Sequence, residues 1–428
     1  MDALTTPSNW QRVRLGDMTT SFTKQTGFDY SASIKPTLIK EQLPNYIPFI
    51  QNKDFLGHYI NYKTDYFIPN EIAIRFPQIL LNEKCLLISI SGAIGNVAVF
   101  NHSQDAFIGG AIAVLKFKEK KSLDFVMHFL MSASGQKLLL NSVKSSSHKN
   151  LTIADLRDLL IPLPPLNEQI AIANILSDVD RYLYSLRALI LKKESVKKAL
   201  SFELLSQRKR LKGFNQAWQR VKVKDFGIII TGSTPLTQIS EYWNGTISWI
   251  TPTDINDNKD IFNSERKITQ KGLDTIRMIP KNSVLVTCIA SIGKNAILRV
   301  NGACNQQINA IIPNKDFNAD FIYYLMENNK QYLLGKAGVT ATYIISKQVF
   351  EEIDFFVPKD LDEQAAIANI LSGLDSEITS LKNKKRQFEN IKKALNHDLM
   401  SAKIRVLKKI KIVLREVLYA IHAKRNRL

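Results

Sequence analysis

Two long stretches of the chain carry apolar residues at alternating intervals of three and four positions. The first runs from Glu168 to about Arg210 and contains neither proline nor glycine, which favours one continuous helix. A helix of about 43 residues would be about 65 Å long at 1.5 Å per residue. The apolar stripes comprise Leu183, Leu186, Ile190, Val196, Leu200 and Leu204 in the first stretch, and Ile378, Leu381, Phe388, Ile391, Leu395 and Leu399 in the second.

An apolar stripe of this kind must be buried, and the most similar surface available to each stripe is the other one. Two similar units that pack through similar faces prefer a two-fold arrangement, which makes the helices antiparallel. We therefore expect an antiparallel coiled coil, interrupted by Lys193 in one stretch and Lys385 in the other. The alternatives are that each helix packs only on its own domain or on another subunit.

The two stretches belong to an internal repeat. Residues 167–180 read NEQIAIANILSDVD and residues 362–375 read DEQAAIANILSGLD, with ten of fourteen positions identical at an offset of 195. The sequence WQRV occurs at 10–13 and again at 218–221, and KKAL occurs at 197–200 and at 392–395. The order along the chain is therefore globular part, helix, globular part, helix.

The globular parts are predicted to mix helices and strands. Short β-rich runs at 85–90, 97–100, 284–289 and 296–300 are separated by Gly, Pro and Asn. Ser122 and Asn318 are suitable N-caps for helices of roughly 16 residues that run through Leu139 and Leu334. The expected fold class is α+β, with two similar mixed α/β globular domains separated by two long helices paired as an antiparallel coiled coil. The expected boundaries are 1–165 and 214–360 for the two domains, 166–213 and 361–406 for the helices, and 407–428 for a basic amphipathic extension.

Charge indicates the kind of partner. Lys and Arg total 58 against 39 acidic residues, a net charge of +19, and such an excess favours a polyanion because phosphate contacts release counterions. Simple solubility or an acidic protein partner are the alternatives. The extension carries Leu407, Ile410, Leu414, Val417 and Ile421 at helical spacing among basic residues, so it is either a further helix that docks on the first domain or a partner, or a solvated tail.

The inventory of catalytic motifs is poor. We find no phosphate-binding glycine loop and no base-methylating tetrapeptide, since Pro164-Pro165 is followed by Leu166. The six histidines are scattered, and Cys85, Cys288 and Cys304 form no CxxC pair, so we expect no metal site and buried reduced thiols. The chain begins without a secretory signal and lacks an apolar run of about 18 residues. These features predict a cytoplasmic binding protein without membrane span, not an enzyme.

The proline-rich strand end that leads into Leu166-Asn167-Glu168-Gln169 and a long Lys-rich helix resembles the central conserved region of type I restriction–modification specificity subunits. Its second copy, 361–364, resembles the C-terminal conserved region of that family, and 231–235 with Tyr242-Trp243 is similar to the opening of many of its target-recognition domains. The resemblance covers 10–406. Two departures are that the first domain reads TSFTKQ at 20–25 in place of that opening, and that 407–428 extends past the second conserved region.

This resemblance implies a non-catalytic, sequence-specific subunit that reads a bipartite, asymmetric site in double-stranded DNA. The paired helices would act as a spacer and as a docking surface for two methyltransferase subunits, and restriction subunits would complete the complex. Cofactors are expected only in those partners, as S-adenosylmethionine, ATP and magnesium. The alternatives are a duplicated DNA-binding regulator or architectural protein without methyltransferase partners, and a scaffold that binds only proteins.

Candidate site residues follow from loop composition, because small hydroxyl residues, Lys and Asn suit phosphate and base-edge contacts, and from the seam positions of the helices. The DNA-binding candidates are Ser145, Ser146, Ser147, His148, Lys149, Asn150, Ser233, Thr234, Trp243, Thr340, Thr342 and Tyr343. The candidates for the subunit and coiled-coil interface are Glu168, Gln169, Leu186, Leu200, Glu363, Gln364, Leu381 and Leu395.

Overall fold

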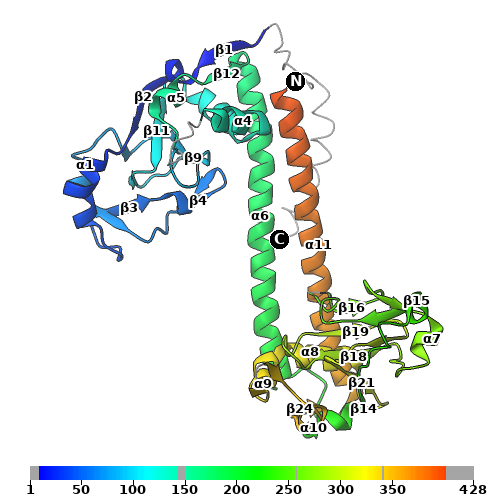
Figure 1. Cartoon of the computed structure of the whole chain (residues 1–428). Helices are drawn as coiled ribbons and strands as arrows, with labels where there is room; N and C mark the ends of the chain where they lie inside the picture. Colours follow the sequence, from blue (N-terminus) through cyan, green and yellow to red (C-terminus); the bar gives the residue numbers. More distant parts are fainter. Residues whose placement is uncertain (1–8, 143–149, 257, 340–341, 402–428) are drawn as a thin grey trace. The chain divides into compact units, whose positions relative to one another are not determined.

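The structure is a computed structural model, and it describes residues 9–142, 150–256, 258–339 and 342–401. The chain forms two compact units. The first unit comprises Met1–Leu186 with Lys384–Leu428, and the second comprises Arg187–Asn383. Each unit contains one globular domain and part of two long helices, α6 (Leu166–Leu205) and α11 (Leu361–Met400), which lie side by side (Figure 1).

The first domain comprises the elements from β1 to β12 and is built on two four-stranded sheets. One sheet has the order β2 (Thr19–Lys24), β11 (Ile112–Phe117), β8 (Cys85–Ser89), β9 (Val97–Phe100). The other has the order β6 (Phe67–Pro69), β3 (Tyr46–Ile50), β10 (Ala106–Ile108), β7 (Leu80–Leu81). Two strand pairs complete it: β1 (Gln11–Arg14) with β12 (Leu160–Leu163), and β4 (Phe55–Leu56) with β5 (Tyr59–Ile60).

The apolar run of β8 explains the layering of the first domain. Successive side chains of a strand point to opposite faces, so Leu86 and Ile88 face one side and Leu87 the other. Leu86 and Ile88 belong to the core that includes helix α3, whereas Leu87 belongs to the core shared with the second sheet. The helices of the domain are α1 (Gly27–Asp29), α2 (Asn70–Ala73), α3 (Leu123–Met131), α4 (Ala133–Asn141) and α5 (Ile153–Arg157).

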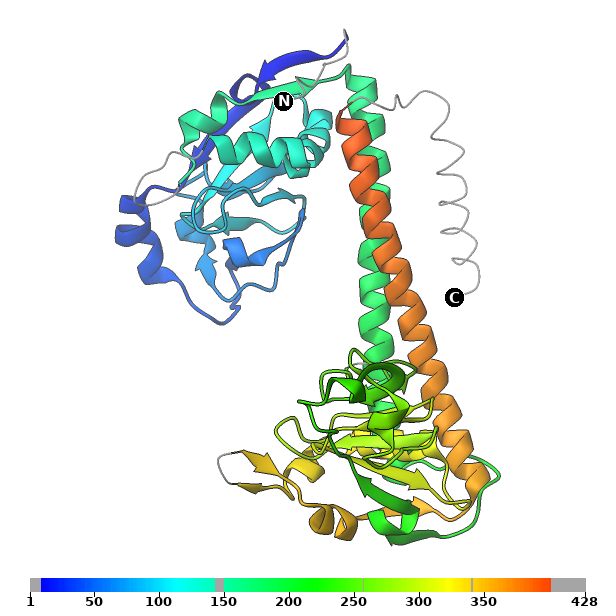
Figure 2. The same cartoon turned by 45° about the vertical axis from the view of Figure 1, so that its right-hand side comes forward.

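The second domain comprises the elements from β13 to β24 and repeats the order of the shared strands, with one more strand at the edge of its main sheet and one fewer in its smaller sheet. Its main sheet has the order β14 (Gly227–Thr231), β21 (Ile308–Pro313), β18 (Ser283–Thr287), β19 (Asn295–Leu298), β16 (Asp260–Ile261). A smaller sheet has the order β17 (Lys267–Ile268), β15 (Trp243–Ile250), β20 (Gly302–Cys304). The strands β13 (Trp218–Lys222) and β24 (Asp354–Pro358) pair as β1 and β12 do, and β22 (Gly338–Val339) with β23 (Tyr343–Ile344) forms a hairpin that projects from the domain (Figure 2). The helices are α7 (Gln270–Leu273), α8 (Ala319–Asn328), α9 (Lys330–Leu334) and α10 (Lys347–Glu352).

Most predicted elements are present, and the differences have local causes. The four β-rich runs correspond to β8, β9, β18 and β19. The two predicted 16-residue helices are each broken: the first at Ser132, whose hydroxyl caps α4 by accepting from Gly135 N, and the second at Asn329. Asn318 caps α8 as predicted, but Ser122 makes no side-chain cap. The helix α6 ends at Leu205, whereas the sequence predicted a helix to about Arg210. The expected extension 407–428 and residues 402–406 of the second predicted helix lie outside the described part of the chain.

Candidate nucleic-acid interface and subunit-docking helices

Within each unit, α6 and α11 pack against each other in opposite directions. In the first unit, Lys392 Nζ lies 2.5 Å from Asp180 Oδ1, and the rings of Tyr182 and Phe388 are 4.6 Å apart. The residue number rises along α6 as it falls along α11, so the pairing is antiparallel. In the second unit, Lys197 contacts Asp375 and Lys193 contacts Glu377 in the same sense, so the predicted antiparallel coiled coil is confirmed.

The seam of this coiled coil differs at one position from the predicted stripe. Leu186 and Leu381 are buried, and Leu200 and Leu395 are half-buried against the cores of the second and first units. Val196 is 44% exposed, so its assignment to the stripe is wrong. The interval of three from Ile190 leads to Lys193 instead, and the seam continues through Lys197. Both lysines are tolerated there because acidic residues of α11 pair with them.

Two ion pairs of the seam are equivalent by the repeat. The offset of 195 relates Asp180 to Asp375 and Lys197 to Lys392. The contact of Lys392 with Asp180 in the first unit therefore repeats the contact of Lys197 with Asp375 in the second. Each of these Asp–Lys pairs joins α6 to α11, so both copies of the repeat use the same groups to bind the other helix.

The Glu-Gln pair that begins α11 is engaged within the second unit. Glu363, 1% exposed at its side chain, accepts hydrogen bonds from Arg210 and from Trp218 Nε1. Gln364 accepts from Asn318 N and donates to the carbonyl oxygen of Pro358. These residues tie the start of the helix to its own domain, and their place at a subunit interface stays a prediction.

The Glu-Gln pair that begins α6 behaves similarly. Gln169 is 3% exposed and donates to the carbonyl oxygen of Pro164 at 2.7 Å, while Glu168 is half-buried. The contact of Gln169 with another subunit stays a prediction. In both units the glutamine of the pair donates to the carbonyl oxygen of a proline just before the helix, so it joins the start of the helix to the preceding strand end.

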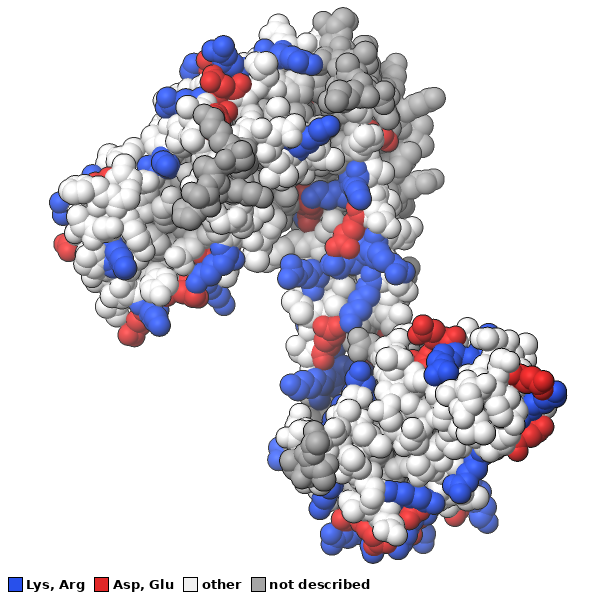
Figure 3. Space-filling view, viewed as in Figure 1, with Lys and Arg blue, Asp and Glu red and all other residues white. Residues whose placement is uncertain are grey.

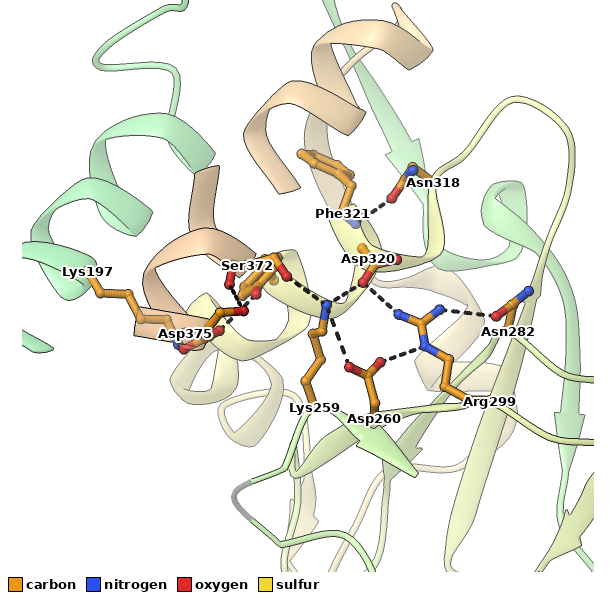
Figure 4. A network of polar contacts seen from close by, with 12 residues as sticks. Lys197, Lys259, Asp260, Asn282, Arg299, Asn318, Asp320, Phe321, Ser372 and Asp375 are labelled. Atoms are coloured by element: carbon orange, nitrogen blue, oxygen red, sulfur yellow. Dashed lines mark hydrogen bonds and ion pairs between the residues drawn. The ribbon is translucent and has the colours of Figure 1, made fainter. Parts of the chain in front are cut away.

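A polar network anchors the second domain on the helices (Figure 4). Lys259 Nζ donates to Asp320 Oδ1 at 2.6 Å and to Ser372 Oγ of α11 at 3.2 Å. Arg299 donates to Asp260 and Asp320, so Asp320 lies between two cations that lower its pKa against the opposing effect of burial. Tyr324 Oη donates to Asp375, the residue that also binds Lys197 of α6. The domain, α6 and α11 are thus linked through one carboxylate.

The first domain is anchored at the equivalent carboxylate by histidines. His58 Nδ1 lies 3.5 Å from Asp180 Oδ2, and both side chains are almost completely buried. His128 Nε2 is 3.1 Å from Ser177 Oγ of α6. Burial lowers the pKa of His58 and, further, that of His128, because both rings would have to hold a charge away from water. The two anchors therefore share a position and differ in chemistry.

Part of the first predicted DNA-binding loop lies within the described residues. Ser145, Ser146, Ser147, His148, Lys149 and, in the second domain, Thr340 lie outside them. Asn150 forms a β-bridge with Ser91, and Ile344 forms the equivalent bridge with Ile289. The ends of the two predicted loops are therefore bridged to equivalent positions of the two domains. Tyr343, in β23, is 50% exposed and Thr342 is exposed, so both lie on the surface, and their contact with DNA stays a prediction.

The predicted residues Ser233, Thr234 and Trp243 lie near one end of the small sheet of the second domain. Ser233 N donates to the carbonyl oxygen of Cys304 at 2.8 Å, and Thr234 Oγ1 donates to Gln306 Oε1 at 2.6 Å. Trp243 is 9% exposed and its indole N–H donates to the carbonyl oxygen of Leu236, so it belongs to the core. Trp243 is therefore not retained as a direct DNA contact.

Trp243 instead supports an arginine that the sequence pattern did not single out. The Arg266 guanidinium lies 4.1 Å from the ring centroid of Trp243 and 4.8 Å from that of Trp249. Arg266 is exposed and forms no ion pair with any described residue. A planar guanidinium held on aromatic rings, with its donors unused, is suited to bidentate contact with phosphate or a base edge. The signal in the sequence is weak, because the stacking joins β15 to a residue that precedes β17, well separated from both tryptophans along the chain.

Basic side chains are distributed over the molecule. Figure 3 shows Lys and Arg interspersed with Asp and Glu on the face that it presents, along the helices as well as on the domains.

No described helix combines the length and apolar character needed to cross a membrane. Cys85, Cys288 and Cys304 are buried free thiols as predicted, and burial raises the pKa of each to about 12. Within the described parts of the chain, no three His, Cys, Asp or Glu side chains are grouped to hold a metal ion.

Duplicated α+β domains with polar loops, joined by paired antiparallel helices, define a two-domain recognition protein. A family model described as type I restriction modification DNA specificity domain matches residues 7–194 and again 215–390. The chain belongs to this family, so the resemblance inferred from the sequence is confirmed. It is a DNA specificity subunit by family, not a catalytic subunit.

Individual relatives agree with the family. The chain is 25% identical over 434 residues to the type I restriction enzyme MjaVIII specificity subunit of Methanocaldococcus jannaschii, with 95% of each chain covered. It is 36% identical to the MjaIX specificity subunit of the same organism over 182 residues, 41% of each chain. The crystal structure of a type I restriction–modification S subunit from M. genitalium covers 93% of this chain and 98% of its own, with 16% identity and a TM-score of 0.60. That structural likeness concerns the fold.

Proposed function

We propose that this protein reads a split, asymmetric site in double-stranded DNA, one half-site with each domain, in the cytoplasm. Two methyltransferase subunits would dock on the paired helices, and restriction subunits would complete the complex. The observation that carries the proposal is the duplication itself: two domains of one topology, with different loops, stand on an antiparallel helix pair. Domains with the same scaffold and different contact residues suit two different half-sites.

The outer face of α6 supports docking of a protein partner. In the second unit, Leu191 and Phe202 are 56% and 47% exposed, and Ala188 and Ala199 lie on the same side at helical spacing. An exposed apolar stripe of this kind is typical of a protein-binding surface. The equivalent positions of α11, at the offset of 195, include Asn383, Arg386 and His397, which are polar. Changing Leu191 to Glu should weaken binding of the methyltransferase more than changing Ser380 to Glu, because Ser380 is exposed on α11 and lies outside this stripe.

Co-production of the full-length chain with a type I methyltransferase subunit of the same organism, followed by methylation mapping of the host chromosome, tests the proposal. The expected result is methylation at a bipartite, non-palindromic sequence that neither protein produces alone. A duplicated DNA-binding regulator would bind duplex DNA without any such partner. A scaffold that binds only proteins would show no loss of duplex binding with rising salt, whereas a DNA reader loses affinity steeply.

A further inference from the structure

Three loops of each domain meet at equivalent positions of the fold. In the second domain they are 232–235 after β14, 251–254 after β15 and 305–307 after β20; in the first they are 25–27 after β2, 51–54 after β3 and 109–111 after β10. The loops of the first domain are called the first loop set, and those of the second domain the second loop set. Asn305 N donates to the carbonyl oxygen of Ile250 at 2.9 Å, and Gly109 N donates to that of Ile50 at 2.8 Å. The same backbone hydrogen bond therefore holds both sets.

A second shared bond fixes the middle loop. Gln51 N donates to Asp54 Oδ2 at 2.8 Å, and Thr251 N donates to Asp254 Oδ2 at 2.8 Å. The Asp that organises the turn is thus the same in both domains, while the residue that it holds is different. The frame is kept, and the side chains presented by the frame are changed.

The change follows a reciprocal pattern. The sheet registers pair Lys24 with Ala113 and Thr231 with Asn309, so Gln25 corresponds to Gly232. The parallel pairs Ile108 with Ile50 and Cys304 with Ile250 make Gly110 correspond to Gln306. At these two corresponding positions each set has a glutamine opposite a glycine, and the two residue types exchange places between the domains. A side chain at Gly110 would meet Gln25 Oε1 at 3.3 Å, which shows how closely these two loops approach.

Unsatisfied polar atoms gather in the loop sets. Gln25 is 3% exposed, yet neither its Nε2 nor its Oε1 has a hydrogen-bond partner, and Asn52 Oδ1 and Ser233 Oγ are buried without one. Among the described residues, the other atoms of this kind belong to Asn295 of the second domain and to Gln169, Asp180 and Asn396 of the two long helices. Buried polar groups are normally paired, and an unpaired one is costly, so these atoms point to a polar ligand that supplies the missing bonds.

Each set also offers space or charge for that ligand. A cavity of about 310 Å³ beside the first set is lined by 51–53 and 109–112, where Gly109 and Gly110 present backbone without side chains. At the second set, Trp249 Nε1 donates to the carbonyl oxygen of Ser233, and Arg266 lies on the Trp249 ring with its donors unpaired. Arg suits guanine and the amide of Gln suits adenine, because each matches the donor and acceptor pattern of that base edge.

We propose that the two loop sets are the base-reading sites, one for each half-site. The Gln25 amide of the first set would select adenine, and the Arg266 guanidinium, which stacks on Trp249 beside the second set, would select guanine. The inference rests on the proposed function and names the contact surface within it. It does not depend on the loops 144–150 and 336–343 chosen from the sequence, although Asn52 Nδ2 donates to the carbonyl oxygen of Ser91, the bridge partner of Asn150.

The test uses the full-length chain assembled with its methyltransferase, and methylation mapping as the readout. Gln25→Leu keeps the size of the side chain and removes the unsatisfied amide, so thermal stability should be unchanged or higher. The preference for adenine at one position of one half-site should nevertheless fall by about 5- to 150-fold, the range for one bidentate base contact. Arg266→Ala should remove a preference for guanine in the other half-site only, and Arg266→Lys should restore it poorly because lysine lacks the planar fork.

Arg277→Ala is the matched control, since Arg277 is an exposed arginine of the second domain that is neither in the loop set nor stacked on Trp243 or Trp249. It should leave both half-sites unchanged. Retention of both half-site preferences in Gln25→Leu and Arg266→Ala would overturn the inference, as would a change in both half-sites caused by either variant. If the unmodified complex methylates no bipartite site at all, the proposed function fails instead, so the two failures are distinguishable.

Discussion

Lengthening both helices by one heptad should widen the gap in the DNA target. The equivalent ion pairs, Asp180 with Lys392 and Lys197 with Asp375, lie on either side of a midpoint near Ala188 of α6 and Asn383 of α11. Seven residues inserted at both points keep the seam in phase and leave each ion pair with its partner. The insertion adds about 10 Å of paired helix at 1.5 Å per residue.

DNA rises about 3.4 Å per base pair, so the gap should grow by about three base pairs, or fewer if the helices lie oblique to the DNA. The half-sites should not change, because neither domain is altered. Methylation mapping of the lengthened protein with its methyltransferase measures both quantities together. The control is a heptad inserted in α6 alone, which moves Lys197 out of register with Asp375 and should abolish assembly.

An active complex with the original gap would show that the helices do not set the spacing. A changed half-site would show that base reading depends on the helices and not only on the domains. Either result refutes the idea that the helix pair acts as a ruler.

Three further predictions concern stability. Leu200→Lys with Leu395→Lys should lower the free energy of unfolding by about 1–2 kcal/mol at each half-buried site and weaken co-purification with the methyltransferase, whereas Lys at the exposed neighbours Ala199 and Ala394 should leave the free energy of unfolding unchanged. Asp375→Asn should lower the free energy of unfolding by about 1–3 kcal/mol, measured by thermal unfolding, because Lys197 and Tyr324 both lose a charged partner that is about a quarter exposed. The control Asp178→Asn breaks only a pair with Arg181 on the same helix and should lower it by about a few tenths of a kcal/mol. Burial lowers the pKa of His58 and His128 below the ordinary 6.5, so the unfolded chain binds more protons in acid and the first unit should lose stability as pH falls below about 6.5. The second unit contains no histidine and should lack this transition, and His128→Gln should flatten the dependence; equal acid sensitivity of both units would contradict the assignment.

The helices and the strand runs were predictable because their signals are local. The stripe around Leu186 and Leu381 follows from intervals of three and four, and the run at β8 follows from consecutive apolar residues. Val196 was misplaced because an apolar residue was preferred over Lys193, and the ion pair with Glu377 that makes a lysine acceptable there joins two distant parts of the chain. Local pattern does not contain that partner.

The loop sets could not be found from the sequence for a similar reason. Gln25 and Gly110 are 85 positions apart, and only the sheet registers bring their loops together. Loop composition led to the polar segments 144–150 and 336–343, while the glycines and glutamines of the loop sets have no distinctive spacing. Trp243 was selected for its resemblance to a family opening, and its structural role is to support Arg266.

The equivalent ion pairs have a consequence for shorter chains. One copy of the repeat contains both kinds of residue that form these ion pairs, because Asp180 and Lys197 lie on the same helix and each binds a residue of the other copy. A fragment ending near residue 213 therefore carries every group that it needs to pair with a second molecule of itself. Such a homodimer would present two identical domains related by two-fold symmetry, and its natural target would be a palindrome. In these terms the full-length chain is a covalently joined pseudo-dimer, in which joining the two halves has freed each domain to diverge from the other.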